Sequence, residues 1–415
     1  MEIERNRYLR RLIGRKWNGS VKVITGIRRC GKSYLLFKLF RDHLLSEGVP
    51  ADNIVAIALD DIKNKNLRDP DALYSTIVKA TENRSEKYYV ILDEIQYVRD
   101  FADVINGLRH MPNVDTYVTG SNSKFLSKDV LTEFRGRGDE VRIYPLSFSE
   151  FSSVFSDVDY AWKQYMTFGG MPELLTRIDD EQRFSYLGNL IDEVYLKDIS
   201  ERNRIQSAEG LGQIVDTLCS STGSLTNPTR ISNALRTSGR SVSNNTVHRY
   251  LELLEESFLF EKAERYDVKG RKYLDTPYKY YIADIGLRNA RLNFRQQEPT
   301  HIMENIIYNE LRSRGYSVDV GVIESRVSKE GISEYRQMEI DFVVNKGDSR
   351  YYIQSAYGIP DEKKREQETR PFEKIGDSFR KIIITGDDIR PWTDGNGIIT
   401  IGIKQFLLDE NSLDL

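Results

Sequence analysis

A short segment near the N-terminus has the residue types and spacing of a phosphate-binding loop. Residues 26–33 read GIRRCGKS, which fits the pattern G-x-x-x-x-G-K-[ST]. The two glycines allow backbone N–H groups to approach and surround an anion. Lys32 is expected to reach the β- and γ-phosphates of a nucleotide, and the Ser33 hydroxyl is expected to bind Mg²⁺. The predicted nucleotide-contacting residues are Gly26, Ile27, Arg28, Arg29, Cys30, Gly31, Lys32 and Ser33.

Two carboxylates end the apolar run at residues 88–94, which reads YYVILDE. Ligands of parallel sheets lie beyond the carboxyl ends of the strands. We therefore expect Asp93 to hold Mg²⁺ and Glu94 to act as the general base for an attacking water. A helix N-cap is the alternative, because acidic residues often precede a helix. The phosphate-loop motif upstream favours the catalytic interpretation.

Two further polar segments are candidates for the same chemistry. Asn122, with Ser121 as second choice, follows another strand-like run and is predicted to orient the water. The alternative is a plain turn, since Gly-Ser-Asn is typical of turns. Arg135 and Arg137 lie beside glycines and are candidates to stabilise transition-state charge from a neighbouring subunit, which would require a homo-oligomer. A solvated loop or a structural ion pair is the alternative for these arginines.

Apolar runs alternate with amphipathic segments through the first third of the chain. This alternation predicts an α/β domain with a mostly parallel sheet and helices on both faces. A strand before the phosphate loop and a helix after it place the positive end of that helix at the anion. We expect strands at 21–25, 54–59, 88–92, 116–119 and 141–144, and helices at 32–45, 71–80, 101–110 and 124–134.

The pattern changes after residue 146, so we predict four domains. The first, 1–146, carries the phosphate loop, and the second, 147–206, is a helical lid broken at Gly-Gly-Met-Pro. A winged-helix domain is expected over 207–290, and an α/β domain over 291–415.

The predicted winged helix has a moderately basic stretch. No acidic residue lies between Asp216 and Glu252. Asparagines at the start of a recognition helix can read adenine edges, and arginines can anchor phosphates, so double-stranded DNA is a candidate partner. A winged helix used only for protein contacts is the alternative. The candidate DNA contacts are Arg240, Asn244, Asn245 and Arg249, and the predicted wing adds Lys269, Arg271 and Lys272.

The composition excludes several classes of protein. The chain has 415 residues, 39% of them hydrophobic, which argues against wholesale disorder. Its 60 lysines and arginines nearly balance 63 aspartates and glutamates, which excludes a globally basic nucleic-acid coat but allows a local basic face. No apolar run approaches the ~20 residues of a membrane span. Two distant cysteines predict neither a disulfide framework nor a zinc site, so we expect a cytoplasmic protein.

The motifs occur in an order that resembles a known family. VILDEIQ at 90–96, TGSNSKFLS at 119–127, PLSFSEF at 145–151 and GGMPE at 169–173 follow the phosphate loop, with Gly136–Arg137 between the second and third. This set resembles the prokaryotic AAA-type ATP-binding proteins that carry a C-terminal domain of uncharacterised function. The resemblance implies a P-loop NTPase domain of the additional-strand type, with a strand between the P-loop strand and the Asp93 strand, and a helical lid.

The last domain resembles the restriction-endonuclease-like fold. Glu304 lies on a predicted helix, and Asp341 lies on a predicted strand. Active members of that fold carry a second carboxylate and a lysine on the next strand, where this chain has Gln354 and Ala356. An amide is a poor Mg²⁺ ligand and alanine cannot polarise water, so we expect this domain to be inactive as a nuclease.

The interpretation that joins these signals is an ATPase that needs Mg²⁺ and associates with DNA through a winged helix. A signalling switch, in which ATP controls a protein partner and hydrolysis is slow, is one alternative. A nuclease gated by ATP is the other. The predicted catalytic residues are Lys32, Glu94, Asn122, Arg137 and Arg135, and the predicted metal ligands are Ser33 and Asp93.

Overall fold

The computed structural model describes residues 2–120, 138–205, 207–237, 242–296, 298–329 and 332–414, with backbone alone from 325 to 336. The chain forms two compact units. The nucleotide unit is Met1–Pro145 with Glu256–Phe258, and the C-terminal unit is Leu146–Glu255 with Leu259–Leu415. Several predictions lie outside the described residues: the helix at 124–134, Ser121, Asn122, Arg135, Arg137 and Arg240.

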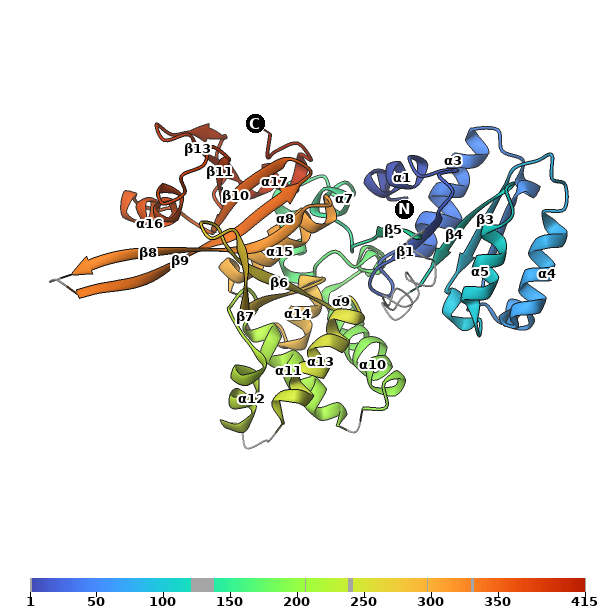
Figure 1. Cartoon of the computed structure of the whole chain (residues 1–415), viewed down its shortest axis with the longest axis horizontal. Helices are drawn as coiled ribbons and strands as arrows, with labels where there is room; N and C mark the ends of the chain where they lie inside the picture. Colours follow the sequence, from blue (N-terminus) through green and yellow to red (C-terminus); the bar gives the residue numbers. More distant parts are fainter. Residues whose placement is uncertain are drawn as a thin grey trace. The chain divides into compact units, whose positions relative to one another are not determined.

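The nucleotide unit is built on five parallel strands in the order β2-β3-β4-β1-β5 (Figure 1). β4 lies between β1 and β3, so the extra strand implied by the family resemblance is confirmed. The last strand starts earlier than predicted, and its pairing continues past its end, where the Ile143 N–H donates to the Thr25 carbonyl (2.8 Å). The strands are β1 (Val21–Thr25), β2 (Ile54–Ala58), β3 (Tyr88–Asp93), β4 (Val114–Thr119) and β5 (Gly138–Arg142).

Helices cover both faces of this sheet, as predicted. On one face, α4 and α5 bury Leu73 and Val104 against strand residues such as Val90. On the other face, Phe40 packs on Tyr117, with ring centroids 4.7 Å apart. The helix after the phosphate loop begins at Lys32 as expected. The helices are α1 (Asn6–Ile13), α2 (Lys32–Tyr34), the π-helix η1 (Leu35–Phe40), α3 (Arg41–Ser46), η2 (Ala51–Asn53), η3 (Ile62–Arg68), α4 (Pro70–Ala80), η4 (Ile95–Tyr97) and α5 (Phe101–Arg109).

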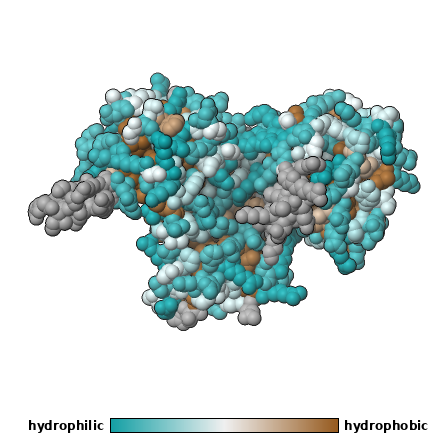
Figure 2. Space-filling view, viewed as in Figure 1, coloured by the Kyte–Doolittle hydropathy of each residue, from teal (hydrophilic) through white to brown (hydrophobic). Residues whose placement is uncertain are grey.

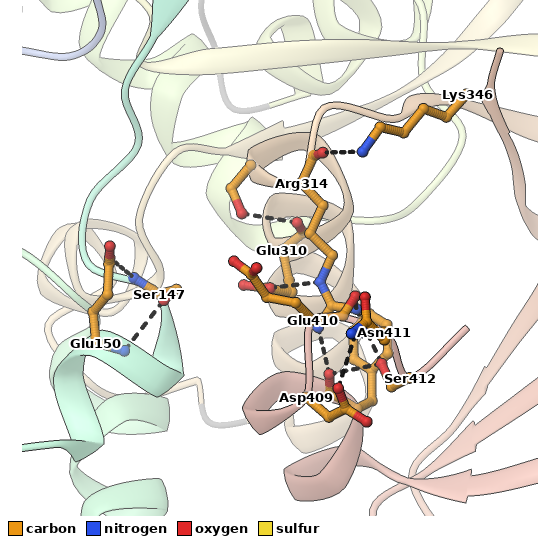
Figure 3. Close-up of polar contacts among 11 residues, drawn as sticks. Ser147, Glu150, Glu310, Arg314, Lys346, Asp409, Glu410, Asn411 and Ser412 are labelled. Atoms are coloured by element: carbon orange, nitrogen blue, oxygen red, sulfur yellow. Dashed lines mark hydrogen bonds and ion pairs between the residues drawn. The ribbon is translucent and has the colours of Figure 1, made fainter. Parts of the chain in front are cut away.

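The C-terminal unit begins with the predicted lid helices. Ser147 and Glu150 form a reciprocal capping box at the start of α7, drawn in Figure 3. The predicted lid helices are interrupted at Gly169, whose φ is 76°. The Gly170 N–H donates to the buried Asp284 carboxylate (2.7 Å), which holds the turn in place. The helices of this segment are α7 (Phe148–Ser152), α8 (Val158–Phe168), η6 (Pro172–Thr176), α9 (Asp180–Asn189), η7 (Leu190–Leu196) and α10 (Lys197–Arg202).

One eight-stranded mixed sheet, in the order β12-β13-β11-β10-β9-β8-β6-β7, organises the rest of this unit. The two strands predicted as a wing, β6 and β7, belong to it because β6 pairs in parallel with β8. The predicted boundaries at 206 and 290 therefore fall inside one compact unit. The strands are β6 (Phe260–Asp267), β7 (Lys272–Ile282), β8 (Ser317–Lys329), β9 (Ile332–Lys346), β10 (Ser349–Ala356), β11 (Arg380–Thr385), β12 (Trp392–Thr393) and β13 (Ile398–Gly402).

The remaining helices complete this unit, and β8 and β9 extend from it as a two-stranded ribbon (Figure 1). Figure 2 shows hydrophilic residues over most of the visible surface. Among the described residues, no helix combines the length and apolar character needed to cross a bilayer. The helices are α11 (Ala208–Ser220), α12 (Pro228–Thr237), α13 (Asn244–Glu256), α14 (Ile285–Arg291), α15 (Pro299–Ser313), α16 (Glu362–Glu373) and α17 (Ile403–Leu408).

A buried arginine ties the end of the chain to α15 (Figure 3). Arg314 Nε donates to Glu310 Oε1 (2.7 Å), and Arg314 Nη1 donates to the Glu410 carbonyl (3.1 Å) and the Ser412 hydroxyl (3.0 Å). The side chains of Arg314 and Glu310 are 4% and 3% exposed. Two charges buried this deeply depend on each other, since either one alone would be uncompensated.

We expect Arg314→Ala to destabilise the C-terminal unit by about 3 kcal/mol or more, because Glu310 is left buried without its partner. Lys404→Ala is the control, since Lys404 pairs with the exposed Asp159 and such pairs contribute at most about 1 kcal/mol. The measurement is urea denaturation followed by circular dichroism. Equal losses in the two variants would contradict the assigned role of Arg314.

Candidate nucleotide-binding site

The phosphate loop adopts a conformation that only its glycines permit at two positions. Gly26 has φ 137° and Gly31 has φ 100°, both in the region that disfavours a side chain. A Cβ atom on Gly26 would lie 2.1 Å from the Ile143 carbonyl oxygen, so the loop packs directly on the chain that follows β5. The loop motif is thus used as the sequence predicts, between a buried strand and a helix.

Lys32 is buried within the loop, with 4% of its surface exposed. Its Nζ donates to the carbonyl oxygens of Gly26 (3.0 Å) and Ile27 (3.1 Å). The ammonium group is therefore positioned over the loop, with neutral acceptors that an anionic phosphate oxygen can outcompete. A phosphate oxygen carries a negative charge and so adds a Coulomb attraction to the ammonium that a neutral carbonyl does not offer.

The two predicted metal ligands lie together. Asp93 is 4% exposed at the end of β3, and its carboxylate accepts hydrogen bonds from the hydroxyls of Ser33 and Thr119. Burial raises the pKa of Asp93, while those two hydrogen bonds oppose the shift. A carboxylate and a hydroxyl at one point are hard oxygen ligands of the kind Mg²⁺ prefers, so these residues fit that ion.

Glu94 is held in a constrained conformation next to this carboxylate. Its φ of 53° and ψ of 48° place it in the left-handed region, which is uncommon for a residue with a side chain. Its N–H donates to Thr119 Oγ1 (2.8 Å), and its carboxylate accepts a hydrogen bond from Gln96 Nε2. Strained backbone of this kind is found at functional sites, where surrounding contacts hold it.

Thr119 is the site residue that the sequence analysis missed. The predicted polar residues, Ser121 and Asn122, follow β4, whereas Thr119, the last residue of the strand itself, contacts both Asp93 and Glu94. The sequence feature that could have indicated Thr119 is its position at the carboxyl end of a strand that neighbours β3.

Arg5 is a second residue that the sequence did not single out. Its guanidinium is buried and donates to the Cys30 carbonyl of the loop (2.8 Å) and to the Tyr144 carbonyl (2.7 Å). The Cys30 thiol also lies 3.6 Å from the Ile143 carbonyl oxygen. The phosphate loop is thus connected to the segment that ends the first part of the nucleotide unit. No local pattern in the sequence indicates this contact.

Comparison with known proteins agrees with this geometry. The family described as "AAA domain" matches residues 18–152. An uncharacterized protein of Haemophilus influenzae is 36% identical over 412 residues, which cover 98% of each chain. The chain belongs to the AAA-type family of ATP-binding proteins. Its middle section, residues 159–298, matches a "Domain of unknown function (DUF8612)".

Two more distant proteins are also similar to this AAA-type protein. The uncharacterized protein MJ1544 of Methanocaldococcus jannaschii is 27% identical over 412 residues, which cover 94% of this chain and 86% of that one. Among solved structures, the Walker-type ATPase PABY2304 of Pyrococcus abyssi shares 16% identity with a TM-score of 0.47. That comparison covers 70% of this chain and 96% of the other.

The helices predicted for a winged helix are present in the AAA-type protein as α11, α12 and α13. Thr226 forms an isolated antiparallel bridge with Tyr278 of β7, which links the start of α12 to the strand pair. Asn244, Asn245 and Arg249 are exposed along one side of α13. Asn244 also donates to the Thr229 hydroxyl (3.3 Å) and so touches α12.

The carboxylates of the region predicted to be nuclease-like surround a lysine. Lys279 Nζ lies 2.8 Å from both Glu304 Oε1 and Glu339 Oε1, and 3.8 Å from Asp341 Oδ1. Burial alone would lower the pKa of Lys279, but the three carboxylates together raise it above its ordinary value. Gln354 accepts the Asp341 N–H (2.8 Å). Among the described residues, no group of three or more histidine, cysteine, aspartate or glutamate residues is arranged to hold a metal ion.

We expect Thr119→Val to lower Mg²⁺-dependent ATP turnover about tenfold or more. The change removes hydrogen bonds to Asp93 and to the Glu94 N–H, and one bond to a charged group contributes about 1.5–3 kcal/mol. Thr116→Val is the matched control, because the buried Thr116 hydroxyl on the same strand has no hydrogen-bond partner among the described residues. A steady-state ATPase assay is the measurement, and Thr119→Ser is expected to keep most activity. Equal turnover in both valine variants would refute the bridging role.

Proposed function

We propose that this AAA-type protein hydrolyses ATP with Mg²⁺ and does so in association with double-stranded DNA. The observation that carries the proposal is the contact of Asp93 with both Ser33 and Thr119, with Glu94 fixed beside them. A P-loop, a metal-binding pair and a constrained carboxylate at one sheet edge are the parts that phosphoryl transfer needs.

In this proposal each described residue has one task. The N–H groups of the loop and the Lys32 ammonium bind the phosphates. Ser33 and Asp93 hold Mg²⁺, which neutralises phosphate charge when it is bound. Glu94 accepts the proton of the attacking water, since it directly follows the metal-binding residue Asp93 and its N–H bonds to the Thr119 hydroxyl beside it. Asn122, Arg135 and Arg137 remain predictions for water orientation and for charge stabilisation from a neighbouring subunit.

The association with DNA is proposed from α13. Its exposed residues Asn245 and Arg249 occupy the side of the helix away from the buried Val247 and Leu251, and Asn244 is exposed in the first turn. Amides at the start of such a helix can contact adenine, and an arginine can contact phosphate. This exposed face supports the DNA interpretation. A protein partner on the same face is the outcome expected if the protein is an ATP-controlled switch.

We further infer that the C-terminal sheet is not a metal-dependent nuclease. The Lys279 ammonium already lies among Glu304, Glu339 and Asp341, and a divalent cation there would face this buried positive charge. Gln354 supplies a neutral amide where a second carboxylate ligand is needed.

Lys32→Ala is expected to abolish ATP binding, and Glu94→Gln to preserve binding while turnover falls ~10²–10⁴-fold. Loss of a phosphate-facing charge removes ground-state affinity, whereas loss of a general base affects the chemical step. Fluorescent-nucleotide titration and a phosphate-release assay measure the two effects separately. Hydrolysis by Glu94→Gln at the parent rate would show that another group is the base.

Replacing Asn244, Asn245 and Arg249 with alanine is expected to weaken duplex-DNA binding at low salt. One lost phosphate contact should reduce the slope of log affinity against log salt by about 1. Arg370→Ala on α16 is the control, because it removes an exposed arginine elsewhere in the same unit. The measurement is fluorescence anisotropy over a salt series. Unchanged affinity in the α13 variant would favour the protein-partner switch.

A further inference from the structure

The C-terminal unit contains a polar cavity of about 740 Å³ that no part of the proposed ATPase uses. Three loops from distant parts of the chain form it: the turn between β6 and β7, the turn between β9 and β10, and the connection from α16 to β11. Its size falls in the range of small-ligand sites, about 300–1,000 Å³. We call it the basic pocket, and its defining residues are Tyr266, Lys269, Arg271, Arg350, Lys374 and Phe379.

Positive charge converges on this pocket from all three loops. Lys269 and Arg271 come from the first turn, Arg350 follows the second, and Lys374 lies on the third. Within the described part of the chain, Lys269, Arg271 and Lys374 form no ion pair with a carboxylate. Cations gathered in a hollow without partners repel each other, and an anionic ligand would relieve that repulsion.

The pocket also contains two carboxylates, but one of them is already engaged. Asp377 accepts hydrogen bonds from the Tyr352 hydroxyl (2.7 Å) and the Phe379 N–H (3.2 Å). Asp348 is the other, and it lies in the turn between β9 and β10. Four cations against two carboxylates leave the lining positive.

Aromatic rings flank the central arginine. The Arg350 guanidinium carbon lies 5.5 Å from the Tyr266 ring centroid and 5.4 Å from the Phe379 ring centroid. Arg350 Nε donates to Asn345 Oδ1 (2.8 Å), which fixes the plane of the guanidinium. Phe379 is 40% exposed, a large fraction for a phenylalanine, so part of its ring remains accessible. Aromatic rings and arginine planes are the surfaces on which unpaired bases stack.

We propose that the basic pocket binds a nucleotide unit of single-stranded nucleic acid. Lys269, Arg271 and Lys374 contact its phosphates, and the base stacks on Phe379 beside Arg350. A free mononucleotide has the same chemistry and is the second source of such a ligand. The inference extends the proposed association with nucleic acid, but it depends neither on ATP hydrolysis nor on α13.

The basic pocket also differs from the wing that the sequence predicts as a contact for duplex DNA. Lys269 and Arg271 line a hollow together with Lys374, whereas Lys272 is exposed and does not line it. A hollow of this kind suits a flexible single strand, whose unpaired bases can enter and stack, better than a duplex, whose bases are paired.

The test compares two variants of the full-length protein by fluorescence anisotropy with labelled oligo-deoxythymidylate. The pocket variant carries Lys269→Ala, Arg271→Ala and Lys374→Ala, and the control carries Lys272→Ala and Arg370→Ala. All five residues are exposed, so both variants are expected to fold, which circular dichroism and thermal unfolding check. The pocket variant should lose about 30-fold or more in single-strand affinity at low salt. Its salt slope should fall by about 2, since each single-strand phosphate contact contributes about 0.7. The control should stay within about twofold.

Competition identifies the source of the ligand. Displacement of the oligonucleotide by thymidine monophosphate supports a free nucleotide, and failure to displace it supports a strand. The proposal is overturned if neither oligonucleotide nor mononucleotide binds at low salt, or if both variants lose affinity equally. It is also overturned if the pocket variant loses only duplex affinity. Failure of duplex binding in the α13 variant, with single-strand binding intact, would remove the duplex proposal and leave this one standing.

Discussion

The nucleotide site depends on the register of three parallel strands. β4 pairs with β1 on one side, where Ile24 faces Thr119, and with β3 on the other, where Leu92 faces Val118. This register brings the phosphate loop, Thr119 and Asp93 to one edge of the sheet. A shift of one residue would turn each side chain to the opposite face of its strand, and the hydroxyl of Thr119 would no longer join the Asp93 carboxylate to the Glu94 N–H.

At the same edge, neighbouring parts of the chain support the phosphate loop. Gly26 packs against the Ile143 carbonyl, and Arg5 donates to carbonyl groups of Cys30 and Tyr144. Backbone carbonyls buried near a loop that must present its N–H groups to phosphate need donors of their own. The Arg5 guanidinium supplies several at once, and it links the N-terminal segment, the loop and the chain beyond β5.

The C-terminal unit is held together by one continuous sheet and by charged side chains buried against it. Pairing of β6 with β8 makes the strand pair that follows the helices part of the C-terminal sheet. Lys279, on β7, then reaches Glu304 on α15 and Glu339 on β9. Removing the Lys279 charge would leave these carboxylates uncompensated in a low-dielectric interior, so the arrangement is costly to disturb.

The sequence by itself determined the parts that local chemistry specifies. These parts are the GIRRCGKS loop, the apolar strands, the carboxylates at the end of β3 and the helices α11–α13. They follow from spacing, periodicity and backbone requirements that each segment carries alone. Only the tertiary structure decided the contacts of Thr119, Arg5 and Lys279, the joining of β6 to β8, and the basic pocket. Their partners lie far apart in the sequence, and strand register and packing bring them together, so no local pattern records them.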